Sequence, residues 1–263
     1  MLTKKMSPLV VALVATVTAS SAWALPAATG SSSASGNYTY TLGGKSGSGV
    51  GSDSDATGAE SSVSGSSKGF GFEASGEAVG GALKAYAATS FAPGAAIGSA
   101  SNAVGTASFT DYVTFTGGSG SADGLFLSTL EGSLKGGAKG SATYEYNISL
   151  FDVAAGTSQL LVSDSHTYGK GKLTVGNEYE SDFSFTFGKT YALVATLSAS
   201  AKNGGIADFK DTATLNFSLG SGVGLTSASG YSYGVPAVPE PQTYAMLLAG
   251  LGMVGAMARR RMK

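Results

Sequence analysis

Apolar and polar residues alternate along several stretches of the chain, a pattern typical of strands with one face toward water. Thr143–Leu150 alternates Tyr, Ile and Leu with Thr, Glu, Asn and Ser. The pattern recurs at 183–187, where Phe alternates with Ser and Thr, and at 214–219, where Leu and Phe alternate with Thr, Asn and Ser. Tyr191–Ala201 adds another run, and long helical periodicity is absent between the two termini. The chain is therefore predicted to be all-β.

Glycine pairs punctuate these runs and predict the turns between them. Gly117-Gly118 and Gly136-Gly137 separate predicted strands, and Asn203-Gly204 is a sequence typical of a two-residue hairpin. Many short strands with glycine turns and no crossover helices favour an antiparallel β-sandwich, jelly-roll-like, over residues 70–235.

One stretch of sequence is echoed 100 residues further on. Ala107, Phe109 and Asp111 in ASFTDYVTF correspond to Ala207, Phe209 and Asp211 in ADFKDTATL. Chance similarity between two strands of like composition is one explanation. The structural interpretation is that the two strands occupy equivalent places in the two halves of a sandwich.

Residues 25–69 are rich in Gly, Ser and Ala and contain few large apolar residues. Such a segment has little apolar surface to offset the entropy lost on ordering. We therefore expect a separate, partly flexible segment here, with a first hairpin around Gly43-Gly44.

Composition restricts the chemistry of the body. There is no Cys, His166 is the single histidine, and only 13% of residues are charged. Between the terminal segments the chain has 10 Lys, no Arg and 16 acidic residues, a net charge of about −6. Phosphate neutralisation requires a basic surface, so we expect no nucleic-acid partner. No cofactor, metal site or catalytic residue is predicted.

Residues 1–24 have the pattern of a secretory signal peptide. Lys4 and Lys5 precede a short apolar core, and Ala22 and Ala24 supply the small residues that signal peptidase accepts. We expect cleavage after Ala24 and export of the chain that follows.

The segment 238–263 has three parts in a fixed order. Pro239 and Pro241 lack amide donors and favour an extended, unpaired backbone around Glu240. Residues 244–258 carry no charge and predict a short transmembrane helix. The cationic side chains that follow stop the chain on the cytoplasmic side: Arg259, Arg260 and Arg261.

This tripartite segment resembles the PEP-CTERM sorting signal of exopolysaccharide-producing Gram-negative bacteria, with Pro239, Glu240 and Pro241 matching the family's motif. The resemblance implies recognition by an exosortase and removal of the tail. It also implies transient anchoring in the inner membrane, followed by a cell-surface or extracellular location. A looser resemblance covers the body, where SFTDYVTF (108–115) and SASGYSY (227–233) are similar to sequences found before many such tails.

These observations favour a non-catalytic surface or matrix protein associated with exopolysaccharide or biofilm. A carbohydrate-binding module is an alternative, in which Tyr144 and Tyr146 or Tyr231 and Tyr233 stack on sugars, although no Trp follows Trp23.

Three further alternatives have less support. A hydrolase would use acids such as Asp111 and Asp211, and self-assembly would use exposed strand edges. The stretch from Asp53 to Gly58 begins like a calcium-binding loop, but Ser64 stands where a glutamate is needed.

Overall fold

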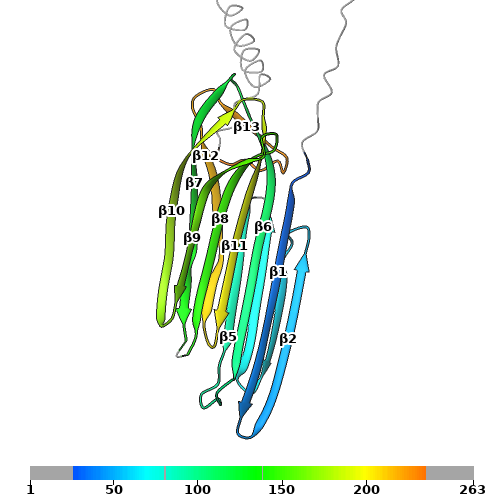
Figure 1. Ribbon diagram of the computed structural model, residues 1–263, viewed down its shortest axis with the longest axis vertical. Coiled ribbons are helices and arrows are strands. Elements are labelled where there is room, and N and C mark those ends of the chain that lie inside the picture. The colour runs from blue at the N-terminus through cyan, green and yellow to red at the C-terminus, as the bar shows by residue number, and fades with distance from the viewer. Residues whose placement is uncertain (1–25, 80, 138, 235–263) are drawn as a thin grey trace, which may run out of the picture.

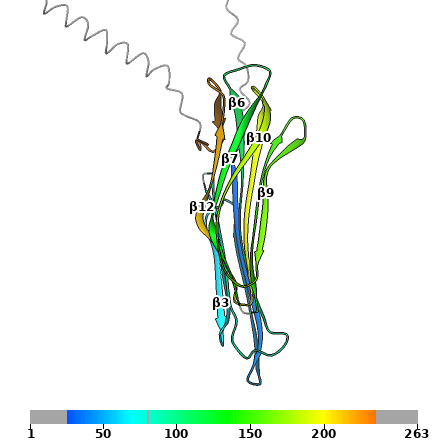
Figure 2. The ribbon, with the colours of Figure 1, turned by 90° about the vertical axis from the view of Figure 1, so that its left-hand side faces the viewer.

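The computed structural model describes residues 26–79, 81–137 and 139–234, which form thirteen strands and no helix. The strands lie in two layers packed face to face along one long axis (Figures 1 and 2). The bounds are β1 Thr29–Leu42, β2 Lys45–Asp55, β3 Ser61–Ser67, β4 Phe70–Val79, β5 Ala82–Ser90, β6 Ala100–Thr116, β7 Ser121–Gly136, β8 Ser141–Asp152, β9 Thr157–Tyr168, β10 Gly171–Thr186, β11 Thr190–Lys202, β12 Ile206–Ser218 and β13 Gly224–Ser227. The predicted all-β sandwich is confirmed at this level.

One sheet has the order β2-β1-β6-β11-β8-β9, with β13 also paired to β6, and the other has the order β10-β7-β12-β5-β4-β3. All pairs are antiparallel. Within the described chain, β1–β2, β3–β4, β4–β5 and β8–β9 are hairpins, and the remaining connections pass between the sheets. β6 pairs with β11 in the first sheet, and β7 pairs with β12 in the second. The consecutive strands β6 and β7 thus lie in different sheets, and each pairs with one of the consecutive strands β11 and β12.

The alternating stretches form strands with the predicted apolar face inward. Tyr144, Tyr146, Ile148 and Leu150 of β8 are all buried. The phenylalanines of β10 and β12 follow the same rule, since Phe183, Phe185 and Phe217 are each 2% exposed. Period-two alternation is a local property of the backbone, which explains why the sequence predicted it correctly.

The expected separate, partly flexible segment at 25–69 is not what the structure shows. Residues 29–67 form β1, β2 and β3, and β1 pairs with the central strand β6 over eleven positions. Small residues are required here because aromatic rings occupy the space that side chains would need. A β-carbon on Gly49 would lie 2.6 Å from the ring of Tyr38, and one on Gly36 would lie 2.2 Å from Phe72. The predicted hairpin around Gly43-Gly44 does join β1 to β2.

Asn203-Gly204 forms a turn, but the hairpin predicted from it is wrong. Asn203 has φ 48° and Gly204 φ 94°, as a tight turn requires. The two strands that it joins lie in different sheets, because β11 pairs with β6 and β8 while β12 pairs with β5 and β7. The Asn-Gly sequence therefore predicted where the chain reverses, but it did not predict which strands pair.

The sequence echo falls on β6 and β12, which are central strands of opposite sheets. Its third position differs between the two copies, because Asp111 is 1% exposed and Asp211 is exposed. β12 contains an irregularity between Phe209 and Ala213, where the partner strand β5 advances only from Ala85 to Leu83. Two extra residues bulge out there, and Asp211 lies within the bulge.

The two sheets approach each other closely where a glycine of one faces the backbone of the other. A β-carbon on Gly105 of β6 would lie 2.1 Å from the carbonyl oxygen of Ser75 and 2.4 Å from that of Tyr86, both in the opposite sheet. Elsewhere aromatic side chains fill the interior. Phe115, for example, stacks on Phe185 with ring centroids 4.2 Å apart.

The long axis gives the molecule two distinct ends. Pro26 and Gly234, where the described chain starts and stops, lie at the same end (Figure 1). We call this the exit end, and it includes the β6–β7 and β10–β11 connections. We call the opposite end the lysine end, and it holds the β1–β2, β3–β4, β5–β6, β7–β8, β9–β10 and β11–β12 connections.

Candidate functional site: a latch at the exit end

A buried carboxylate lies near the exit end of β6. The alternation of this strand turns Phe109, Asp111, Val113 and Phe115 into the sandwich, and all four are buried. An ionised carboxylate in an apolar interior is costly unless donors surround it. The groups that donate hydrogen bonds to the Asp111 carboxylate therefore indicate the role of this residue.

The donors come from the last described segment, residues 224–233, which we call the strap. β13 at its start pairs with Val113–Thr116 of β6, beyond the point where β1 begins its own pairing at Thr110. The backbone then continues along β6, where Ala228 N–H donates to the carbonyl oxygen of Tyr112 at 2.9 Å. The strap thus occupies the edge of β6 that β1 leaves open.

Four hydrogen bonds connect the strap to Asp111. Ser227 Oγ donates to Oδ2 at 2.7 Å, Ser229 Oγ donates to the same oxygen at 2.5 Å, and Ser229 N–H donates to Oδ1 at 3.0 Å. Tyr233 OH, which is fully buried, donates to Oδ2 at 2.6 Å. The backbone of Tyr233 also accepts a bond from Phe217 N–H at 2.8 Å. We call this arrangement the latch.

The latch changes the acidity of both of its buried ends. Burial opposes ionisation of Asp111, but the hydrogen bonds from Ser229, Tyr233 and Ser227 outweigh it and lower the pKa of the carboxyl below its usual value. Burial and the bond to Asp111 raise the pKa of Tyr233. At neutral pH the latch therefore holds a carboxylate and a protonated phenol, which is the pairing that keeps the strap closed.

A cavity of about 170 Å³ lies beside the latch. Its lining includes Thr29 and Thr57 from the start of the body, Val79, Asp111 and Tyr233. Both oxygens of Asp111 already accept hydrogen bonds from the strap. These hydrogen bonds between the strap and Asp111 therefore fix the position at which the chain leaves the body.

A second cluster, partly exposed, ties the sheets together at the β9–β10 edge. Asp164 Oδ2 on β9 accepts hydrogen bonds from Tyr144 OH and Tyr179 OH, both at 2.5 Å, and from Asn177 Nδ2 at 3.1 Å. Tyr144 belongs to the first sheet, while Asn177 and Tyr179 belong to β10 of the second. Burial and the bond to Asp164 raise the pKa of Tyr144 to about 12. These residues cross-link the sandwich.

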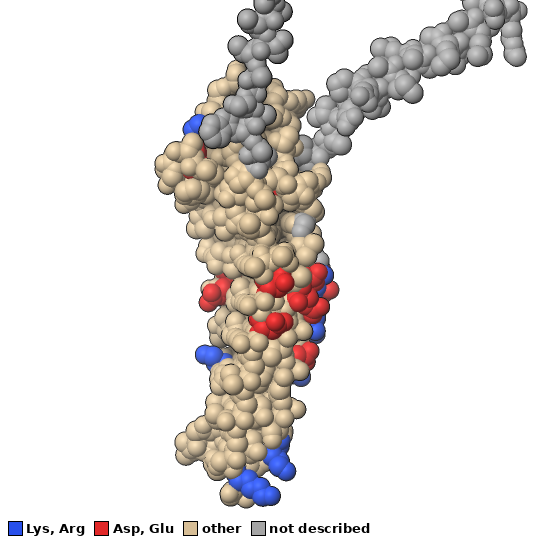
Figure 3. Space-filling model, turned by 90° about the vertical axis from the view of Figure 1, so that its right-hand side faces the viewer, with Lys and Arg blue, Asp and Glu red and all other residues tan. Residues whose placement is uncertain are grey.

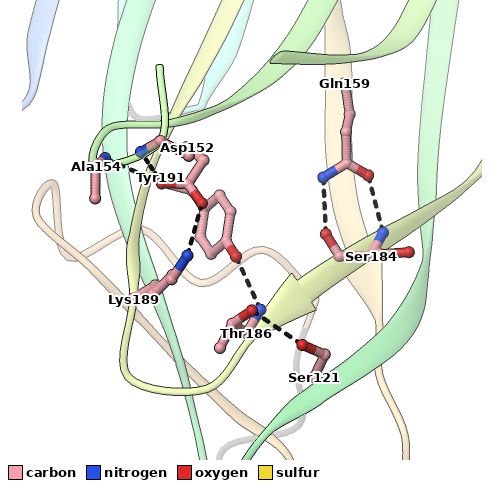
Figure 4. A network of polar contacts seen from close by, with 9 residues as sticks. Ser121, Asp152, Ala154, Gln159, Ser184, Thr186, Lys189 and Tyr191 are labelled. Atoms are coloured by element: carbon pink, nitrogen blue, oxygen red, sulfur yellow. Dashed lines mark hydrogen bonds and ion pairs between the residues drawn. The ribbon is translucent and has the colours of Figure 1, made fainter. Parts of the chain in front are cut away.

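A further set of polar contacts joins the same edge closer to the exit end (Figure 4). The amide of Gln159 on β9 forms two bonds with the backbone of Ser184 on β10, at 2.7 Å and 2.9 Å. Tyr191 OH accepts a bond from Thr186 N–H at 2.8 Å, and Lys189 Nζ lies 3.2 Å from Asp152 Oδ2. A side-chain amide here replaces the ladder bonds that two edge strands of different sheets cannot make.

The structure does not bring the candidate hydrolase acids together. Asp111 is enclosed by the strap, and Asp211 is exposed on the bulge of the other sheet. His166 lies on β9, and the centroid of its exposed ring is 6.4 Å from that of Tyr168. Asp55 of the calcium-loop candidate accepts bonds from Thr57 and Ala59, which are contacts of a turn.

The predicted processing residues lie outside the described residues. They are Ala22 and Ala24 of the signal peptide, Pro239, Glu240 and Pro241 of the sorting motif, Arg259, Arg260 and Arg261 of the basic tail, and the predicted transmembrane helix at 244–258. Among the residues that the structure does describe, no helix is long and apolar enough to cross a membrane.

Fold and latch together define a two-sheet β-sandwich protein with a clamped point of exit just ahead of its C-terminal segment. That segment has a known counterpart. Residues 237–261 match the family model described as PEP-CTERM protein-sorting motif, and this chain is accordingly a PEP-CTERM motif-containing protein. The match includes the predicted sorting residues and the three arginines, and it supports an exported protein sorted by exosortase.

The other comparisons add no functional information. No curated protein matches the chain. A chain from the structure of infectious bursal disease virus Gx strain is 11% identical, with 88% of this chain and 75% of that chain covered, at a TM-score of 0.14. A likeness this weak supports no argument about the fold.

Sequence reasoning missed the latch, although both of its halves were visible. The motif SFTDYVTF contains Asp111, and SASGYSY contains Ser227, Ser229 and Tyr233. The two motifs stand 116 positions apart at Ser227 and Asp111, and only the fold brings them into contact. Their joint resemblance to sequences preceding PEP-CTERM tails was the available signal.

Proposed function

We propose that this protein is a non-catalytic surface or matrix component with a jelly-roll-like body, delivered by exosortase and associated with exopolysaccharide. The observation that carries the proposal is the position of the sorting motif. Residues 237–261 begin shortly after Gly234, where the strap is held to the body by Asp111. A clamped exit fixes the point at which the sorting segment leaves the body, and Pro239 and Pro241 favour the extended backbone that a processing enzyme can bind.

The proposed route uses both terminal segments. Signal peptidase cleaves after Ala24, and the apolar helix at 244–258 holds the chain in the inner membrane with Arg259–Arg261 on the cytoplasmic side. Exosortase then recognises Pro239–Pro241 and removes the tail. The body is left at the cell surface or in the extracellular matrix.

The non-catalytic role is supported by the contacts of two acids, the buried Asp111 and the half-buried Asp164. Asp111 accepts four hydrogen bonds that hold the strap. Asp164 accepts three, of which the two from Asn177 and Tyr179 join the sheets. Both carboxylates are therefore occupied with the structure of the body. Neither is positioned as a free acid or base facing a substrate.

A carbohydrate-binding module is the second candidate, and the outer face of the first sheet favours it. Hydroxyl groups line up there across neighbouring strands, as in the row Ser54, Ser33, Thr106 and Ser198. Thr106 and Ser198 lie within 3.3 Å of each other, and Ser108 and Thr196 repeat this contact in the next row. The predicted stacking on Tyr144 and Tyr146 is less suitable, since both rings are buried.

Processing in the native host tests the proposal. Pro239→Ala combined with Pro241→Ala should leave the tail in place, because the rigid extended segment is lost. Intact-mass measurement should then show a chain that retains Arg259–Arg261 and stays in the membrane fraction. Pro236→Ala is the matched control, since it removes a nearby proline outside the matched residues. Normal tail removal in the double variant would refute the proposed route.

A further inference from the structure

Lysines are concentrated at the lysine end of the body. Seven of the ten body lysines lie within two residues of a connection there, and each is exposed. They are Lys45, Lys68, Lys135, Lys139, Lys170, Lys172 and Lys202. Five of the six connections at this end contain or adjoin a lysine, and β5–β6 is the exception.

No Asp or Glu lies within two residues of the six connections at the lysine end, although Glu73 of β4 shares a register row of the second sheet with Lys135 of β7. The other acids lie further along the body. Asp55, for example, lies midway along it, and Asp152 lies at the exit end beside Lys189. Figure 3 shows one face, on which acidic side chains gather midway along the body with some basic ones among them, while the lower tip carries basic side chains and no acidic ones. The net charge of about −6 therefore conceals a cationic end on an anionic body.

These seven lysines are not used to stabilise the described body. Of the residues that the structure describes, the only ion pairs are Lys84–Glu77 and Lys189–Asp152, and neither belongs to this end. Lys139 Nζ lies 6.0 Å from the ring of Phe91, a weak contact at most.

Lys68 occupies a position that disfavours lysine. Its φ of 51° and that of Gly69, 83°, are those of a turn in which Asn or Gly is preferred at both places. Lysine at a left-handed position strains the backbone, and no ion pair within the described chain compensates for it. Binding of an anionic ligand by Lys68 would explain why a lysine stands at this strained position.

Uncharged donors adjoin the cationic end on the outer face of the first sheet. Lys202 is the register partner of Asn102, whose Nδ2 lies 3.5 Å from Oδ1 of Asn37. Beside Lys45, the hydroxyl groups of Thr41 and Ser46 lie 2.9 Å apart. A ligand that covers this region meets ammonium groups together with amides and hydroxyls.

We propose that the lysine end binds an acidic polysaccharide, through its carboxylate groups at the lysines and its hydroxyls at the adjoining Asn, Ser and Thr. This deepens the proposed function and rests on it. Arginine, the preferred side chain for bidentate phosphate contacts, does not occur between residues 25 and 258. The aromatic rings near this end, such as Phe70 and Phe72, are buried and offer no platform for nucleic-acid bases.

Binding to alginate, an acidic glycan, tests the proposal. The full chain in a nonionic detergent should bind alginate more tightly than dextran, which is uncharged. Replacing all seven lysines by Gln should weaken alginate binding at least tenfold at 0.15 M salt, and should make binding less sensitive to salt. The matched control replaces the other body lysines, as K84Q/K189Q/K210Q, and should stay within twofold of wild type.

Two partial variants keep the test valid if the sevenfold variant does not fold. K45Q/K68Q/K202Q and K135Q/K139Q/K170Q/K172Q should each weaken alginate binding less than the full set. Unchanged binding in all lysine-end variants would overturn the proposal. So would tighter binding to duplex DNA than to alginate, or binding to phosphatidylglycerol vesicles without alginate binding. Tail processing is read separately by mass, so a failure here leaves the sorting route standing.

Discussion

At the scale of single residues, Asp111 obtains all its donors from a segment more than a hundred positions away in the chain. Its inward direction follows from the alternation of β6, which is readable in the sequence. The donors are not, because Ser227, Ser229 and Tyr233 reach it only after both sheets have formed. A buried charge of this kind makes the strap part of the body rather than the beginning of a linker.

Substitutions in the latch should lower stability. Asp111→Asn removes the charge that four donors face, and should cost about 2–3 kcal/mol of unfolding free energy. Tyr233→Phe removes one of these bonds, and should cost about 1.5 kcal/mol. Urea denaturation measures both. Asp211→Asn is the matched control from the repeated sequence, and should change stability by less than about 0.5 kcal/mol because it is exposed.

The acid limit of stability should depend on the same residue. The pKa of Asp111 is lower in the folded protein than in the unfolded chain, where it is about 3.9. Its contribution is therefore fully present above the unfolded pKa and is lost as the pH falls through the folded value. Asp111→Asn should flatten the loss of stability below about pH 4 in a urea series. An unaltered pH profile would contradict the role of the ionised form.

Gly105 marks a close approach between the sheets. Gly105→Ala should cost about 1–3 kcal/mol, since the added carbon meets two backbone carbonyls that can move only with their strands. Gly176→Ala on β10 has no atom within 4 Å and serves as the control. Thermal unfolding of both variants compares them. Equal melting temperatures would show that the sheets can separate at no cost.

At the scale of strands, local pattern and long-range pairing were predictable to different degrees. The alternation in β8, β10 and β12 predicted their buried faces, because side chains of a strand take opposite faces wherever the strand lies. The partners of a strand depend on the rest of the chain, so Asn203-Gly204 predicted a hairpin that does not exist. Residues 29–67 were misjudged because glycine there makes room for rings on other strands, such as Phe72.

The bulge in β12 gives a test of register. Deleting Asp211 and Thr212 together should preserve folding, because removal of two residues keeps Ala213, Leu215 and Phe217 on their present side. Deleting Asp211 alone should abolish folding, because it turns Leu215 and Phe217 toward water. Circular dichroism and thermal unfolding distinguish the two. A folded single-deletion variant would show that the register is not fixed by these side chains.

At the scale of the whole molecule, charge is organised by position along the axis. Composition showed an anionic body, and on that basis the sequence predicted no nucleic-acid partner. The fold places seven lysines at one end because six of its reversals, far apart in the sequence, fall there. Only the order of the strands in the two sheets could reveal this. The sorting motif, by contrast, was legible directly because its residues are contiguous.

The opposite placement of the exit and the lysines has a mechanical consequence. A pull between Gly234 and the far turns would run parallel to the strands, which lie along the long axis (Figure 1). Under such a load the backbone bonds of each ladder are sheared together, whereas a pull across the strands would open them one after another. A body held at its two ends is therefore loaded in shear, the direction in which a β-ladder resists force best. The contacts to Asp111, which lie next to the point of attachment, are loaded first.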